Sequence, residues 1–206
     1  MSTDHHHGGP KQPDLEDSPL THHQLLELAV TDLLIEKGVF SADDMRRGLE
    51  RIDARSPALG AKLVARAWVD PAFKARVLED ANAAAAELGI DAGTIPIKAV
   101  ASADDLHHVI VCTLCSCYPR GLLGLPPDWY KSRVYRSRVV REPRAVLAEM
   151  GTTVPESVEV RVHDSTAELR YIVIPKRPEG TENLSEAELE ALVTRDCMIG
   201  VSVPEA

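Results

Sequence analysis

The sequence predicts an α+β fold, in which a helical first part precedes short strands mixed with helices. Apolar residues recur at helical spacing between Leu25 and Leu34, which is typical of an amphipathic helix. The segments 158–162 and 169–174 alternate between apolar and polar residues, as half-buried strands do. Helices that precede the strands, rather than alternating with them throughout, favour α+β over a doubly wound sheet.

Composition and charge exclude several classes of protein. The chain has 206 residues and a formal net charge of −9, whereas a general nucleic-acid binder carries a basic surface. It contains no run of about 18 apolar residues, so no segment is expected to span a membrane. The N-terminus lacks the apolar core of a signal peptide, which predicts a cytoplasmic protein. Four cysteines, three of them clustered, do not form the pattern of a secreted disulfide framework.

The first ninety residues divide into an arm and a helical region. Residues 1–20 contain His5, His6 and His7 with several glycines and prolines, and this composition predicts a disordered arm. Residues 21–90 carry helix start and stop signals throughout. The expected helices run from Thr21 to Gly38, from Ser41 towards Arg55, from Pro57 to Val69 and from Ala72 to Leu88. The region is interpreted as a clasp for a partner chain, with an ordinary bundle as the alternative.

Residues 91–206 are expected to form one mixed metal-binding domain. The expected strands cover 95–100, 108–111, 158–162 and 169–174. The expected helices cover 128–140, 143–151 and 185–193, and an apolar run follows at 198–203. The last two strands are expected to form a β-hairpin or to lie as neighbours.

The loop 112–117, directly after the apolar run 109–111, has the spacing of a metal site. Cys112 and Cys115 are placed to bind one ion through sulfur, and Cys117 adds a third sulfur. The short distance along the chain from Cys115 to Cys117 brings the amide nitrogens of Ser116 and Cys117 within reach of a small trivalent ion. Three sulfurs and two nitrogens leave one octahedral position open for water or substrate, as in catalytic sites.

A structural zinc site is the alternative that the residues alone leave open. Its fourth ligand would be Cys197, His107 or His108. No second Cys-x-x-Cys pair supports this alternative, and Cys197 lies in an apolar segment, where a cysteine is usually buried and inert.

The metal loop is part of a longer pattern in the second half of the chain. The loop reads Val111-Cys112-Thr113-Leu114-Cys115-Ser116-Cys117-Tyr118. The later segments of the pattern are 123–131, 135–144, 161–165, 170–175 and 194–201. Together they resemble the α subunits of nitrile hydratases, densely over about residues 108–203 and loosely over the helical region. Threonine after the first cysteine is the version associated with non-corrin cobalt, whereas the iron version has serine.

The resemblance implies an enzyme subunit that hydrates a nitrile to its amide. The implied metal ligands are the thiolates of Cys112, Cys115 and Cys117 and the amide nitrogens of Ser116 and Cys117. The family oxidises the second of these cysteines to sulfinic acid and the third to sulfenic acid. Either the Cys117 sulfenate or a nearby water would supply the attacking oxygen. The implied metal is non-corrin Co(III), with iron second and zinc only in a mis-metallated form.

The resemblance also implies partners. A β-type subunit of one or two chains would donate two arginines to the oxidised sulfurs, because no motif in this chain clearly supplies them. A metallochaperone and a small nitrile complete the expected set.

Further side chains are candidates for the surroundings of the metal. Asp164, Glu168 and Arg170 are similar to positions that support the active site in the family, with a solvated turn and strand face as the alternative. Ser116 is a candidate for positioning solvent beside the metal, with capping of the loop by its side chain as the alternative. Trp129 is a candidate substrate contact, with packing in the core or an interface as the alternative.

The sequence departs from the family pattern at two places. Residues 91–94 stand where the family has a Gln-Gly-Glu segment, so a supporting glutamine is missing or replaced. Arg120 stands where many two-subunit nitrile hydratases have tryptophan. A guanidinium suits an anion or a hydrogen-bonding heterocycle better than an alkyl nitrile, which makes Arg120 a candidate substrate contact.

Two alternatives therefore stay beside the leading interpretation. The metal subunit of thiocyanate hydrolase resembles the chain at Arg120, as do three-subunit nitrile hydratases that act on heteroaromatic nitriles such as toyocamycin. In a different class of function, the chain would be a structural zinc or metal-carrier module without turnover of its own.

Overall fold

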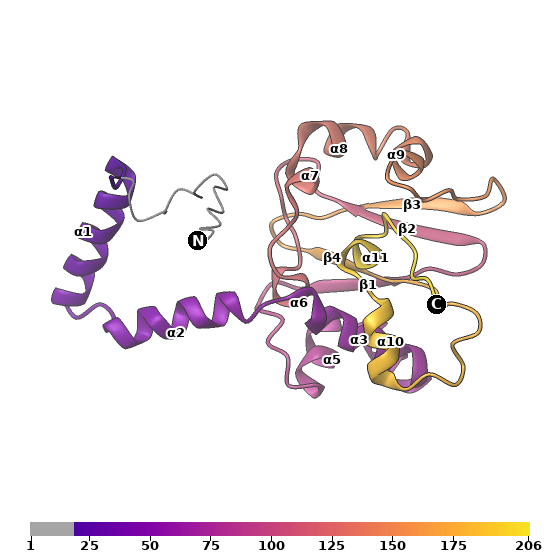
Figure 1. Cartoon of the computed structure of the whole chain (residues 1–206), viewed down its shortest axis with the longest axis horizontal. Coiled ribbons are helices and arrows are strands. Elements are labelled where there is room, and N and C mark those ends of the chain that lie inside the picture. The colour runs from indigo at the N-terminus through magenta and orange to yellow at the C-terminus, as the bar shows by residue number, and fades with distance from the viewer. Residues whose placement is uncertain (1–18) are drawn as a thin grey trace, which may run out of the picture. The chain divides into compact units, whose positions relative to one another are not determined.

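The computed structural model describes residues 19–206, so all but the end of the predicted arm 1–20, including its three histidines, lies outside the described residues. The chain divides into two compact units between Glu50 and Arg51. The first unit contains α1 (His22–Glu36) and the start of α2 (Ala42–Asp53) (Figure 1). The predicted helix start at Ser41 is confirmed as a capping box, in which the Asp44 amide donates to Ser41 Oγ at 3.1 Å and the Ser41 amide donates to Asp44 Oδ2 at 3.0 Å. Neither helix contains a buried residue.

The second unit begins with three helices: α3 (Pro57–Val69), α4 (Pro71–Glu79) and α5 (Ala81–Glu87). The prediction of one helix over 72–88 is wrong. Asp80 ends α4, and its carboxylate accepts a hydrogen bond from the amide of Ala83, which starts α5. An aspartate that satisfies a free amide in this way competes with continuation of the preceding helix.

Four short strands form two parallel ladders, and this pairing corrects the expected hairpin (Figure 1). The strands are β1 (Ile97–Ala101), β2 (Leu106–Val111), β3 (Glu159–Asp164) and β4 (Arg170–Ile174). β1 pairs with β4, and β2 pairs with β3. The last two strands are therefore not joined as a hairpin, because each pairs with a strand from earlier in the chain. The register sets Val111 opposite Asp164, so the chain enters the cysteine loop beside the end of β3.

Six shorter helices complete the second unit. They are α6 (Arg120–Leu123), α7 (Asp128–Lys131), α8 (Arg133–Arg138), α9 (Pro143–Glu149), α10 (Glu186–Leu192) and α11 (Arg195–Ile199). The single helix expected over 128–140 is two helices, because Ser132 caps α8 by accepting from the amide of Tyr135. Helices and short strands together confirm the predicted α+β class. No helix within residues 19–206 has the length and apolar character needed to cross a bilayer.

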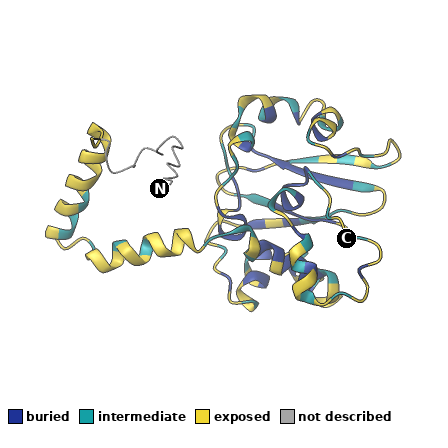
Figure 2. Ribbon diagram, in the orientation of Figure 1, coloured by how far each residue is buried: buried dark blue, intermediate teal, exposed yellow. Residues whose placement is uncertain are grey.

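The core lies between the strands and the helices that cover them, as the dark blue segments of Figure 2 show. The largest fully buried side chains are Tyr130, Phe73, Leu63, Ile110, Leu122, Leu123, Leu147, Ile172, Ile174, Leu189, Met198 and Ile199. α11 packs closely on β2 at Gly200, where a Cβ atom would lie only 2.0 Å from the carbonyl oxygen of His108. This contact fixes the strand that leads into the cysteine loop.

Two histidines tie β3 to β2. Nε2 of His163 lies 2.8 Å from Nδ1 of His108, and the His108 ring also bonds to the carbonyl of Ala101. The neutral His108 ring therefore accepts at Nδ1 and donates at its other nitrogen. Burial, followed by the proximity of His163 and Arg161, lowers the pKa of His108 to about 4. Burial also lowers the pKa of His163.

The histidine pair predicts a loss of stability in acid. The folded pKa of His108 lies below its unfolded value, so the unfolded chain binds more protons as the pH falls from about 6.5 towards 4. We expect His108 to contribute a decrease of roughly 2–3 kcal/mol in the free energy of unfolding over this range. Urea unfolding at several pH values measures it, and His108→Gln should flatten the acid limb. An unchanged acid limb in that variant would refute the assignment.

Candidate metal centre

The cysteine loop leaves the end of β2 with one sulfur anchored and two accessible. Cys112 follows the buried residues 109–111 and is itself buried, whereas Cys115 is exposed and Cys117 is partly exposed. Sγ of Cys115 lies 3.4 Å from Sγ of Cys112 and 3.3 Å from Sγ of Cys117. All three sulfurs lie within 4.8 Å of one another. The loop thus gathers three thiols on one side.

These distances fit a single metal ion. Two sulfurs that bind one ion at about 2.3 Å lie about 3.3 Å apart when their bonds are at right angles, and about 3.8 Å apart in a tetrahedron. The separations of the Cys115 sulfur from those of Cys112 and Cys117, 3.4 and 3.3 Å, match the right-angle arrangement of an octahedral site better than a zinc tetrahedron. Among residues 19–206, no histidine, carboxylate or fourth cysteine joins this group.

The surroundings of the thiols favour ionisation of Cys115 first. Hydrogen bonds from Cys117 and Cys112, followed by one from the amide of Ser116, lower the pKa of Cys115 to about 7. Burial and the contact with Cys115 raise the pKa of Cys117 to about 12, while Arg170 acts in the opposite direction. The amide of Cys117 also contributes to lowering the pKa of Cys115, so the two amides that follow Cys115 interact favourably with its thiolate.

Three side chains from outside the loop form hydrogen bonds to it. The carboxylate of Asp164 accepts from the amide and the hydroxyl of Thr113, at 2.9 and 2.6 Å. Nη1 of Arg136 donates to the carbonyl of Thr113 at 3.2 Å. The hydroxyl of Tyr130 donates to the carbonyl of Cys117 at 2.9 Å. The exposed Asp164 therefore contacts the loop directly, at the residue that follows the first cysteine.

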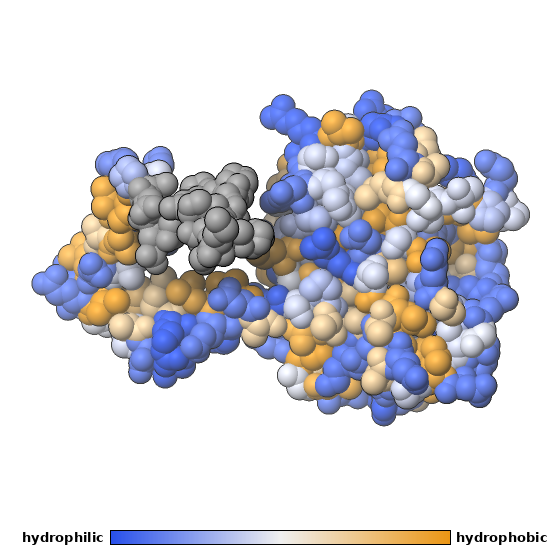
Figure 3. Space-filling model, viewed as in Figure 1, coloured by the Kyte–Doolittle hydropathy of each residue, from blue (hydrophilic) through white to orange (hydrophobic). Residues whose placement is uncertain are grey.

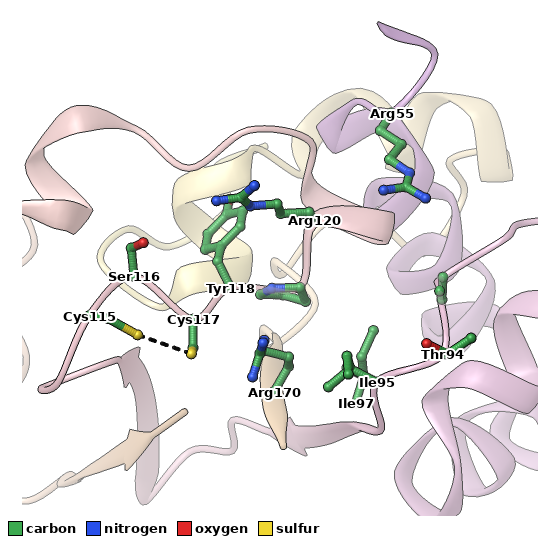
Figure 4. Close-up of a pocket in the computed structure, with 13 residues that line it drawn as sticks. Arg55, Thr94, Ile95, Ile97, Cys115, Ser116, Cys117, Tyr118, Arg120 and Arg170 are labelled. Atoms are coloured by element: carbon green, nitrogen blue, oxygen red, sulfur yellow. Dashed lines mark hydrogen bonds between the residues drawn. The ribbon is translucent and has the colours of Figure 1, made fainter. Parts of the chain in front are cut away.

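A cavity of about 480 Å³ opens in front of the loop (Figure 4). It is lined by Arg55, Ala92, Gly93, Thr94, Ile95, Ile97, Cys115, Ser116, Cys117, Tyr118, Pro119, Arg120 and Arg170. The lining contains three arginines and no carboxylate. Segment 92–94, which replaces the family's Gln-Gly-Glu, therefore forms part of the wall. A small neutral or anionic molecule suits this charge distribution better than a cation.

Of the three arginines in the lining, Arg170 is the one that interacts with the Cys117 thiol. It starts β4 beside Ile97, and Figure 4 shows its guanidinium turned towards Cys117. Its Nη1 is buried and has no hydrogen-bond partner within the described chain. An unpaired buried guanidinium nitrogen is costly, so a bound anionic or polar group would compensate it. Arg120 is exposed at the start of α6 and lines the same cavity.

Other candidate residues lie away from the cavity lining. Trp129 packs edge-on against Tyr135 at 4.9 Å between ring centroids, behind the loop and not among the lining residues. Glu168 is exposed in the turn between β3 and β4 and does not line the cavity. Cys197 is buried, 3.1 Å from the hydroxyl of Thr194.

The two histidines considered as zinc ligands also have other partners. Nε2 of His107 contacts the carbonyl of Gly200 at 2.8 Å, and His108 pairs with His163. None of the three possible fourth ligands (Cys197, His107 and His108) joins the group of sulfurs. The structure therefore does not support the zinc alternative.

Sequence reasoning missed three contributors to the site. Arg55 lines the cavity from the segment before α3, Tyr130 bonds to the carbonyl of Cys117, and Arg136 bonds to that of Thr113. The one signal available for Arg136 was its place among the closely spaced basic residues of segment 131–144. No local pattern identifies Arg55, because its place in the cavity depends on packing between distant segments.

The comparisons with known proteins settle the family. The family model described as nitrile hydratase, alpha chain, matches residues 21–202. The chain belongs to the nitrile hydratase α-chain family. A nitrile hydratase α-type chain is an enzyme subunit, and the three converging thiols provide its candidate metal site. This result confirms the resemblance predicted from the cysteine loop.

Three relatives show the range of this family. The chain is 44% identical to the thiocyanate hydrolase subunit gamma of Thiobacillus thioparus over 221 residues, covering 100% of this chain and 91% of that protein. It is 51% identical to the low-molecular weight cobalt-containing nitrile hydratase subunit alpha of Rhodococcus rhodochrous, covering 85% of this chain and 86% of that protein. A solved double mutant of the Fe-type nitrile hydratase from Comamonas testosteroni Ni1 is 42% identical, with a TM-score of 0.78 and coverage of 90% and 93%. The nitrile hydratases similar to this chain thus include both cobalt and iron types.

Proposed function

We propose that the chain is the metal-binding subunit of a cobalt nitrile hydratase and hydrates a nitrile to the corresponding amide. The observation that carries the proposal is the convergence of three sulfurs within 4.8 Å of one another, two of which line a cavity of about 480 Å³. The proposed ligands are the sulfurs of Cys112, Cys115 and Cys117 and the amide nitrogens of Ser116 and Cys117. Threonine at position 113 and the cobalt-containing relatives support Co(III) over iron.

The cavity side chains have distinct proposed roles in this reaction. A cobalt ion held by the loop would act as a Lewis acid towards the nitrile nitrogen. Either the oxygen of oxidised Cys117 would add to the nitrile carbon, with water then releasing the amide and restoring that oxygen, or a water held by Ser116 would add directly. Arg170, whose guanidinium is turned towards Cys117 and whose Nη1 has no partner within the described residues, stabilises negative charge on the attacking oxygen. Asp164 holds the loop through Thr113, and Glu168 acts only indirectly, from the exposed turn before β4.

Partner chains are part of the proposal. Large apolar side chains of α1 and α2 are about half exposed, and Figure 3 shows them as orange patches. They are Leu25, Leu26, Leu28, Val30, Leu33, Leu49 and Ile52. Exposed apolar residues at this density are typical of a surface that another chain covers. We propose that residues 21–90 clasp a β-type subunit of one or two chains, and that a metallochaperone loads the cobalt.

Metal analysis combined with intact mass tests the leading proposal. We expect about one cobalt per chain and about three added oxygens, two on Cys115 and one on Cys117. The chain purified with its partners should hydrate an aliphatic or heteroaromatic nitrile. Zinc with unmodified thiols would contradict the proposal, and turnover of thiocyanate but of no nitrile would replace it with the second candidate.

A thiocyanate hydrolase subunit is the second candidate, and the charge of the cavity favours it. Arg55, Arg120 and Arg170 line the cavity without a carboxylate, and this suits an anionic substrate. Exchanging Arg120 for glutamine should lower kcat/KM for thiocyanate by roughly 10–100-fold, because a charge-assisted hydrogen bond contributes about 1.5–3 kcal/mol. The effect on an uncharged nitrile should be smaller.

The matched control for Arg120 is Arg133→Gln, which removes an exposed arginine outside the cavity. Steady-state assays on thiocyanate and on an uncharged nitrile make the comparison. Equal losses on both substrates would show that Arg120 does not discriminate by charge.

A further inference from the structure

Within the metal loop, Thr113 is held at both its amide and its carbonyl by charged side chains from other elements. Its amide and hydroxyl donate to Asp164 at the end of β3. Its carbonyl, on the other side of the same residue, accepts from Nη1 of Arg136 in α8. Asp164 and Arg136, both distant from the loop in sequence, thus form hydrogen bonds to the same residue between Cys112 and Cys115.

The hydrogen bonds to Thr113 hold a part of the loop that lacks apolar packing. The side chain of Leu114 is 86% exposed, so burial of this residue does not fix the loop. Cys115 is also exposed. The direction of the chain from Thr113 to Cys115 therefore depends on polar contacts, and the contact from Arg136 orients the peptide that leads to the second sulfur.

The position of Arg136 is itself well fixed. The neighbouring Tyr135 is buried, and its hydroxyl donates to the carbonyl of Ile110 at 2.7 Å. This bond ties α8 to β2, the strand that leads into the loop. The helix begins at Ser132, whose hydroxyl caps it. Arg136 thus extends to the loop from a helix that is anchored to the same strand.

The stability of the fold does not account for Arg136. Its Nε is buried and has no partner within the described residues, so part of its guanidinium loses solvation without compensation. Neighbouring arginines form several bonds away from the loop. Arg138 pairs with Glu142 and Glu149. Arg144 donates to the backbone carbonyls of Val154, Pro155 and Val158. Within residues 19–206, the contact with the loop is the one hydrogen bond that the Arg136 side chain makes.

We propose that Arg136 is a positioning residue that holds the metal loop in its binding conformation before the metal arrives. It acts opposite Asp164, so that the sulfurs converge without the ion and less ordering entropy is lost on binding. The proposal rests on the proposed function only in taking a metal as the ligand of the loop.

The test compares three full-length variants in metal-free form. Arg136→Met keeps the aliphatic stem and removes the donor, Arg136→Lys keeps a charged donor, and Arg133→Met removes an exposed arginine from the same helix. Hydrogen exchange of residues 113–117 should be several-fold faster in Arg136→Met and unchanged in Arg133→Met. Cobalt(II) titration should show an affinity roughly 10–100-fold lower for Arg136→Met, partly restored in Arg136→Lys. The melting temperature of Arg136→Met should stay close to that of the unmodified chain.

Each outcome decides the proposal. Wild-type exchange and wild-type cobalt affinity in Arg136→Met would overturn it. A loss of affinity that parallels a fall in melting temperature would show a structural role instead. If Arg136→Met does not fold, Arg136→Gln takes its place under the same criteria, and failure of both to fold also assigns a structural role. Absence of cobalt binding by the unmodified chain would contradict the proposed function. The hydrogen-exchange measurement would still test whether Arg136 holds the loop.

Discussion

Replacing Cys115 by alanine is expected to abolish both cobalt retention and catalytic activity. Its sulfur is the middle member of the group, 3.4 Å from Sγ of Cys112 and 3.3 Å from Sγ of Cys117. Its removal eliminates one thiolate and separates the two that remain, and no other cysteine, histidine or carboxylate among residues 19–206 stands ready to replace it. Metal content after purification, measured by mass spectrometry, should fall from about one cobalt per chain to background.

Cys197→Ala is the matched control for this experiment. Cys197 is also buried, yet it lies outside the group of sulfurs and contacts the hydroxyls of Thr194 and Ser202. The control should lose about 1 kcal/mol of stability and keep its metal. Cobalt retained near one per chain in Cys115→Ala would contradict the proposed coordination, whereas loss in both variants would indicate a general effect of cysteine removal.

Gly200→Ala is expected to destabilise the second unit by about 3 kcal/mol or more. The added Cβ would lie 2.0 Å from the carbonyl oxygen of His108 and 3.0 Å from Cα of Val109. The residue also has φ +88°, a conformation that costs an L-residue roughly 1–2 kcal/mol. The clash and the strain act together, and relief of the clash requires movement of β2, which carries the cysteine loop. Urea unfolding monitored by circular dichroism measures the loss.

Gly180→Ala separates the two causes. Gly180 has φ +78°, but a Cβ atom there would meet nothing within 4 Å. We expect this control to lose only the conformational part, about 1–2 kcal/mol. Similar losses in both variants would show that close packing of α11 on β2 does not contribute.

The helix boundaries show where local sequence signals suffice. The helices expected to start at Ser41 and Ser185 do so, each with a capping box that joins residues only three apart. The same reasoning failed at Asp80 and Ser132, where a polar side chain starts a new helix inside a continuous helical pattern. Both residues carried the signal of an N-cap, and the surrounding periodicity outweighed it in the prediction.

The strand pairing shows where local signals fail. Alternation identified β3 and β4 as strands, but it is identical for a hairpin and for two strands that pair elsewhere. The partners of these strands lie more than fifty residues earlier in the chain. Burial of apolar faces against the helices selects the parallel pairing, and this choice depends on the whole core.

The sequence by itself determined the family, the α+β class and the clustering of three thiols, because each depends on residues that are close along the chain. Spacings of three and two residues are enough to bring sulfur atoms together, whichever fold carries them. Only the tertiary structure decided what surrounds the sulfurs: Asp164 and Arg136 on Thr113, and Arg55, Arg120 and Arg170 around one cavity. These contacts join segments separated by 23 residues in one case and 51 in another. They arise from strand pairing and helix packing, which no local pattern encodes.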